Sequence, residues 1–232
     1  ANFGSIYYLN RQYEPEDTTD DEIIEFDSSK TSMDSGLKRF ITYDSLSEFS
    51  FHVSGPLMMV YWLRDLKFDY IELAILINVS QVLGLFSMRY WGKKIDNNGS
   101  YSTIRFTSFC IGIIPMFWVG IYYLPNEFIL AGSIIIASLA SLMFSGRALA
   151  LDNRLYEHMK NKKMIKVTSK RFFFRGLSIF IGGLIGGLLT KNESSLSNYI
   201  HLDTIIHAVM GFSAVLRLGV WSYFLKDKRS EI

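Results

Sequence analysis

The chain has 232 residues, and its 24 Lys and Arg against 22 Asp and Glu give a net charge of +2, which gives no support for nucleic-acid binding. The single cysteine, Cys110, lies in an apolar run and excludes both a disulfide within the chain and a thiolate metal site. The charge is unevenly distributed: residues 14–34 hold nine acidic residues and one lysine, so we expect a solvated acidic segment joined to a different kind of structure.

The first 42 residues are predicted to precede the folded part of the chain. The opening stretch ANFGSIYYL is apolar for only nine residues, whereas a helix that spans a membrane needs about 20. We interpret residues 1–42 as the end of a preceding helix followed by an acidic cytoplasmic linker, and we expect the chain to be a piece of a longer protein.

Six apolar segments follow this linker. The first, Tyr43–Leu63, is the weakest because two acidic residues and a histidine interrupt it. The five clear segments are Tyr70–Tyr90, Phe106–Leu124, Phe128–Gly146, Phe172–Thr190 and Leu202–Leu225. Each can cross about 30 Å of hydrocarbon as a helix, and stretches such as SIIIASLASLMFSG lack the charged face of a soluble helix. The predicted fold is an all-α membrane protein, with a six-transmembrane-helix bundle over residues 43–226 and a cytoplasmic tail over residues 227–232.

The first segment carries a candidate pair for proton coupling. Glu48 and His52 stand four residues apart and therefore share one helix face. A carboxylate beside an imidazole, which titrates near neutral pH, can exchange protons within the membrane. The alternative is that Glu48, which follows Asp44, lies at the cytoplasmic interface and that His52 hydrogen-bonds a neighbouring helix. Pro56, next to Gly55, is expected to loosen this helix near its middle.

Later segments hold further polar residues. Asn78 and Gln81, three residues apart in the second helix, either line a cavity or hold neighbouring helices together by hydrogen bonds. Arg147, near the cytoplasmic end of the fourth span, either attracts an anionic solute or extends to the interface. His207 and Arg217 lie ten residues apart in the last helix.

The polar stretch WGKKIDNNGSYSTIR, Trp91–Arg105, separates the second and third spans. We predict a tight cytoplasmic turn here. Gly92 and Gly99 permit sharp changes of backbone direction, and the Asn-Asn pair before Gly99 tolerates left-handed geometry. Asp96 is expected to cap a helix N-terminus or to pair with a cation.

A glycine-rich stretch in the fifth span predicts close helix packing. It contains two overlapping Gly-x-x-x-Gly pairs, formed by Gly182, Gly183, Gly186 and Gly187. Glycines at this spacing let the backbone of another helix approach closely.

Motifs for catalysis and cofactor binding are missing from the sequence. It has no Walker loop, no His-Glu-x-x-His, no dinucleotide fingerprint and no nucleophile elbow. The basic loops do not interleave lysines with base-stacking aromatics. We therefore predict no enzymatic activity, no metal site, no cofactor and no nucleic-acid partner.

Lysine and arginine predict the orientation of the bundle. Taken alternately, the connections fall into two sets, which carry 19 and 3 of these residues. Because basic residues concentrate on the cytoplasmic side of membrane proteins, both ends of the chain are predicted to be cytoplasmic.

The turn between the second and third spans resembles the loop signature of the major facilitator superfamily, Gly-x-x-x-Asp-x-x-Gly, at Gly92, Asp96 and Gly99. It departs from the usual pattern at Asn97, where a basic residue is common, and at the Ser-Tyr pair after Gly99. The long basic loop before the fifth span and the glycines within that span also resemble the family. The resemblance implies the C-terminal six-helix half of a twelve-helix transporter, with residues 1–42 as the central linker and Gly92, Asp96 and Gly99 as a gating loop. The last helix is peripheral in this family, so the resemblance also implies structural or interfacial roles for His207 and Arg217.

Two functions follow from these expectations. The first is a secondary active transporter, a symporter or antiporter that moves a small solute by alternating access, with this chain as one part of it. Its partners are then the lipid bilayer, the solute and an N-terminal six-helix half on the same or a separate chain. The alternative is a non-transporting scaffold subunit, derived from a half-transporter, that docks other membrane subunits. The solute and the coupling ion are not identified by the sequence.

Overall fold

The computed structural model describes residues 35–158, 164–191 and 205–225. All of them belong to the second of two units in the chain, Asp34–Ile232. The predicted acidic linker, apart from residues 35–42, lies outside the described residues, as does the tail over residues 227–232.

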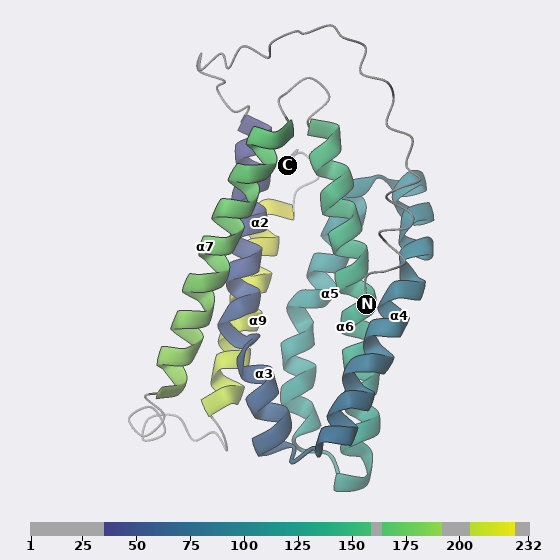
Figure 1. Ribbon diagram of the computed structural model, residues 1–232, viewed down its shortest axis with the longest axis vertical. Coiled ribbons are helices and arrows are strands. Elements are labelled where there is room, and N and C mark those ends of the chain that lie inside the picture. The colour runs from purple at the N-terminus through teal and green to yellow at the C-terminus, as the bar shows by residue number, and fades with distance from the viewer. Residues whose placement is uncertain (1–34, 159–163, 192–204, 226–232) are drawn as a thin grey trace, which may run out of the picture. The chain divides into compact units, whose positions relative to one another are not determined.

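The described elements are helices, and they form two neighbouring groups (Figure 1). In chain order they are α2 (Ser35–Ser54), α3 (Leu57–Val60), the π-helical turn η1 (Tyr61–Asp65), α4 (Tyr70–Asn98), α5 (Ser100–Ile121), α6 (Asn126–His158), α7 (Met164–Lys191) and α9 (Ile205–Leu225). Helices α2, α7 and α9 pack together, as do α4, α5 and α6, and α5 also packs against α9. The all-α prediction is therefore confirmed for the described part of the chain.

Five of these helices, α4, α5, α6, α7 and α9, are long and apolar enough to cross a membrane. They correspond to the five clear spans of the sequence, and they support a multi-pass membrane protein.

Helix α2 is the weaker first span. It begins at Ser35, eight residues before the predicted start at Tyr43, and its buried side chains include Asp44 and Glu48. Polar groups on α2 face the other helices, and for this reason hydropathy alone detects the helix poorly.

The first span is interrupted at Gly55 and Pro56, where loosening was expected. Helix α2 ends at Ser54, and α3 begins at Leu57. Proline lacks a backbone N–H, and its ring clashes with the carbonyl four residues earlier. The amide of Gly55 still donates to the carbonyl oxygen of Phe51 at 2.9 Å, so the helical hydrogen bonding of α2 continues as far as Gly55.

The predicted turn around residues 92–99 is confined to one residue. Helix α4 continues through Gly92, Asp96 and the Asn-Asn pair to Asn98, and only Gly99 leaves the helical conformation, at φ 80°. The expectation of a longer turn that starts at Gly92 is therefore wrong. A glycine inside a helix costs only about 1 kcal/mol relative to alanine, so Gly92 does not end α4, and α5 starts directly after Gly99.

Glycines allow the closest helix contacts. In α7, Cβ atoms at Gly182 and Gly186 would collide with the backbone carbonyl oxygens of Phe49 and Val53 in α2. The Gly182 and Gly186 pair therefore lies in the α2–α7 contact. The second pair is differently placed, because a Cβ at Gly183 would only touch Pro56, 3.9 Å away, and a Cβ at Gly187 would meet no atom within 4 Å.

Candidate functional site

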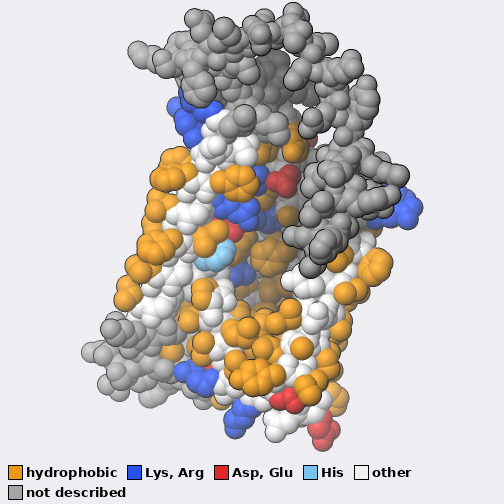
Figure 2. Space-filling view, viewed as in Figure 1, with side chains coloured by type: hydrophobic (Ala, Val, Ile, Leu, Met, Phe, Trp, Pro, Cys, Tyr) orange, Lys and Arg blue, Asp and Glu red, His pale blue; other side chains and the backbone are white. Residues whose placement is uncertain are grey.

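A cavity of about 530 Å³ lies between the two groups of helices. Every described helix contributes to its lining, and most of the lining side chains are apolar. Figure 2 shows the hollow on one face of the bundle, with arginine, carboxylate and histidine side chains gathered at it. Towards the end of the bundle that carries α3, the same face is mostly apolar.

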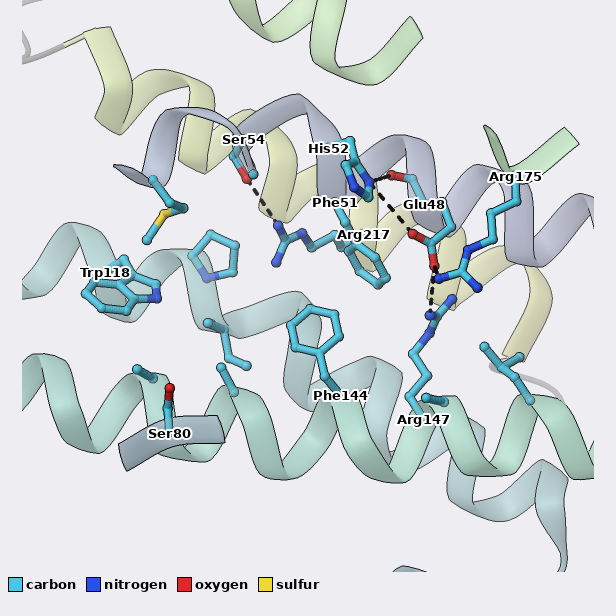
Figure 3. Close-up of a pocket in the computed structure, with 18 of the residues that line it drawn as sticks. Glu48, Phe51, His52, Ser54, Ser80, Trp118, Phe144, Arg147, Arg175 and Arg217 are labelled. Carbon is cyan, nitrogen blue, oxygen red and sulfur yellow. Dashed lines mark hydrogen bonds and ion pairs between the residues drawn. The ribbon is translucent and has the colours of Figure 1, made fainter. Parts of the chain in front are cut away.

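Glu48 is the centre of the charged part of the cavity. It is only 4% exposed, and its carboxylate lies 3.5 Å from Arg147 Nη1 of α6 and 3.1 Å from Arg175 Nη2 of α7 (Figure 3). His52, one turn further along α2, places Nδ1 at 3.7 Å from the same carboxylate and at 2.9 Å from the backbone oxygen of Glu48. One carboxylate therefore links α2 to both α6 and α7, with an imidazole beside it.

Asp44 extends this network one turn earlier on α2. It is fully buried, and its carboxylate accepts a hydrogen bond from Arg171 Nε at 2.8 Å and lies 3.6 Å from Arg147 Nη2. Arg171 also donates from Nη1 to Asp152 at 2.9 Å. The result is a row of alternating charges: Asp152, Arg171, Asp44, Arg147, Glu48 and Arg175. Buried ions of this kind are tolerated only when each one has a partner.

Arg217 of α9 also lines the cavity, with a different set of partners. Its Nε donates to Ser213 Oγ at 3.1 Å, Nη2 to Ser54 Oγ at 3.1 Å, and Nη1 to the carbonyl oxygen of Ile111 at 3.3 Å. The guanidinium also lies 5.0 Å above the ring of Phe51. These partners are all neutral. Within the described part of the chain, Arg217 forms no ion pair.

The structure brings three of the five pathway candidates to the cavity. Glu48, His52 and Arg147 line it, and Arg147 is buried between carboxylates instead of reaching the interface. Asn78 and Gln81 do not line the cavity. Both are exposed on α4, and Asn78 Nδ2 donates to the carbonyl of Ala74 in its own helix at 2.7 Å.

Sequence reasoning missed several residues of the cavity. Arg217 was expected to be structural or interfacial, whereas the structure directs it into the cavity. The sequence signal was present, because a charged residue within an apolar span is costly and marks a functional site by default. Asp44, Arg171 and Arg175 gave no such signal, since they lie at or near predicted span ends.

The residues of the proposed gating loop lie outside the cavity. Asp96 is exposed in the last turn of α4, and its carboxylate makes no hydrogen bond or ion pair with the described residues. It therefore neither caps a helix nor pairs with a cation within this part of the chain.

Comparisons of the chain with protein-family models, with curated proteins and with solved structures find no match.

Proposed function

We propose that the chain is part of a secondary active transporter, which moves a small solute across a membrane by alternating access. The observation that carries this proposal is the cavity of about 530 Å³ between two groups of membrane-type helices, with buried ion pairs beside it. Its volume falls in the range of roughly 300–1,000 Å³ that is usual for small-molecule sites. Sites between helix groups, lined by intramembrane charges, are typical of transporters.

The charge network supplies a coupling mechanism. Glu48 attracts Arg147 of α6 and Arg175 of α7 only while it is ionised. When Glu48 accepts a proton, both attractions weaken, and α2 is held less firmly to α6 and to α7. His52, 3.7 Å away, is placed to exchange that proton. Protonation of one carboxylate thereby shifts the population between two arrangements of the helices.

Two further features fit such a movement. At Gly182 and Gly186 the α2–α7 contact is made mainly by backbone atoms of α2, so the two helices approach closely there without large interlocking side chains. The interruption at Gly55 and Pro56 gives the first span a hinge beside the cavity.

Partners are part of the same proposal. The resemblance to a half-transporter implies another six-helix half, and the exposed amides of Asn78 and Gln81 on α4 are suited to hydrogen bonds with a neighbouring membrane helix.

The proposal is tested in proteoliposomes that contain the full-length protein and a trapped pH-sensitive dye. A panel of small neutral, cationic and anionic solutes is added outside, and acidification or alkalinisation of the lumen reports transport coupled to protons. We expect at least one solute to give a signal with the unmodified protein, and Glu48→Gln to abolish it while leaving counterflow of that solute intact. Glu127→Gln is the control, because Glu127 is exposed in the first turn of α6 and does not line the cavity.

A wild-type rate of proton movement in Glu48→Gln would refute the coupling role of this carboxylate. The scaffold subunit is the second candidate, and the observation that favours it is the departure of the loop from the family pattern at Asn97, where a basic residue is common. If the chain is a scaffold subunit, we expect no proton movement and no solute counterflow with any member of the panel.

A further inference from the structure

Arg217 differs from the other arginines of the cavity in its charge balance. Arg147, Arg171 and Arg175 each lie within 4 Å of a carboxylate. Their carboxylate partners are also three in number, namely Asp44, Glu48 and Asp152. The three arginines and the three carboxylates together carry no net charge. Arg217 then leaves the cavity, within the described residues, with one positive charge in excess.

The hydrogen bonds of Arg217 leave part of its guanidinium available. A guanidinium has five N–H groups, and three of them donate to Ser213, Ser54 and Ile111. One N–H remains on each of Nη1 and Nη2. Two neighbouring N–H groups of an arginine match the two oxygens of a carboxylate. The neutral partners hold the guanidinium in place, but they do not compensate its charge.

The surroundings of Arg217 show what else a ligand must carry. Figure 3 places Arg217 between the ion pairs of Glu48 and the apolar end of the cavity at Trp118. The ring of Trp62 packs against Trp118, with 5.5 Å between the ring centroids, and Met58 and Ile114 also line the cavity. An anionic group at Arg217 therefore has apolar side chains on one side and a neutralised network on the other.

We propose that Arg217 binds the carboxylate of a small organic monoanion whose apolar body lies against Met58, Trp62 and Trp118. This inference rests on the proposed function and names the substrate class of the same cavity. A single excess positive charge suits a monoanion, whereas a phosphate dianion would need a second uncompensated cation. The apolar lining suits an organic body over a fully hydrated inorganic ion.

Binding is tested without transport, by titrating the tryptophan fluorescence of the full-length protein in detergent. Trp62 and Trp118 line the cavity and serve as reporters. The probes are hexanoate, its neutral analogue hexanamide, and inorganic phosphate. We expect saturable binding of hexanoate that is at least about tenfold tighter than binding of hexanamide or phosphate. Hexanamide lacks the negative charge that strengthens a hydrogen bond to Arg217, and phosphate lacks an apolar body to lie against the tryptophans.

The variants are Arg217→Gln, Arg217→Lys and, as a control, Arg89→Gln. Arg89 is exposed on α4 and lies outside the cavity lining. Arg217→Gln should weaken hexanoate binding by about tenfold or more, Arg217→Lys should restore part of it, and Arg89→Gln should bind like the unmodified protein. Thermal unfolding separates binding from folding: Arg217→Gln should unfold at or above the wild-type temperature, because an uncompensated charge is removed, and hexanoate should no longer raise that temperature.

Wild-type affinity for hexanoate in Arg217→Gln would overturn the proposal, as would equal binding of hexanamide or preferential binding of phosphate by the unmodified protein. The two proposals fail separately. Hexanoate binding that depends on Arg217, without counterflow of any solute, would leave this site standing and refute transport. Proton-coupled movement of neutral solutes that persists in Arg217→Gln would leave transport standing and refute this site.

Discussion

Single residues of the charge network depend on partners that are far away in the sequence. Arg171 bonds to Asp44, 127 residues earlier, and Arg147 lies beside Glu48, 99 residues earlier. Sequence spacing within one helix predicts that Glu48 and His52 share a face, and the structure has them 3.7 Å apart. Spacing gives no information on which helices lie side by side. For this reason Glu48, His52 and Arg147 could be selected from the sequence as candidates. The other members of the network, Asp44, Arg171 and Arg175, could not be predicted.

The buried and exposed ends of the network should respond differently to the same substitution. Asp44→Asn removes the carboxylate charge between Arg147 and Arg171, and loss of one partner of a buried ion pair costs about 3–5 kcal/mol. Asp152→Asn removes a partner of Arg171 whose side chain is 61% exposed, and loss of an exposed pair costs about 0–1 kcal/mol. We expect a marked fall in the unfolding temperature of Asp44→Asn in detergent and little change for Asp152→Asn. Equal unfolding temperatures for the two variants would show that Asp44 is not essential to the network.

At the scale of elements, each helix predicted from an apolar run has a counterpart among the described helices. Their ends were less predictable. Helix α4 extends to Asn98 because the polar residues after Tyr90 are compatible with a helix, and only Gly99, at φ 80°, forces the chain to turn. Helix α2 begins eight residues before its apolar segment, because buried polar side chains on α2, Asp44 among them, are paired inside the bundle and hydropathy does not detect them.

The two glycine pairs of α7 offer a test of the α2–α7 contact. Gly186→Leu would place a side chain where the backbone of Val53 lies, whereas the equivalent position at Gly187 has no atom within 4 Å. We expect Gly186→Leu to lower the unfolding temperature strongly and to reduce solute counterflow, because overpacking separates α7 from α2 and costs about 1–3 kcal/mol or more. Gly187→Leu should behave like the unmodified protein in both measurements. Similar behaviour of the two variants would mean that the close approach at Gly186 is not needed.

At the scale of the whole molecule, the distribution of Lys and Arg predicts which side of the membrane each connection faces. Helix α5 has 22 residues, a length of about 33 Å at 1.5 Å per residue. Asn97 lies just before this helix and Asn126 just after it, and both are exposed. The excess of Lys and Arg in the connection at Asn97 predicts that this end of α5 faces the cytoplasm. The two asparagines should therefore lie on opposite sides of the membrane.

Single cysteines at these positions measure the topology directly. Asn97→Cys and Asn126→Cys are introduced separately into a Cys110→Ala background, which removes the only native thiol. A maleimide that does not cross membranes, added outside intact cells, should label Asn126→Cys, while Asn97→Cys should react only after the membrane is opened. Labelling in detergent is the control, and there both variants should react, since both positions are exposed. If both variants react in intact cells, or neither does, α5 does not cross the membrane. If only Asn97→Cys reacts, the bundle crosses it in the opposite orientation, and Glu48 and Arg147 then lie nearer the outer face.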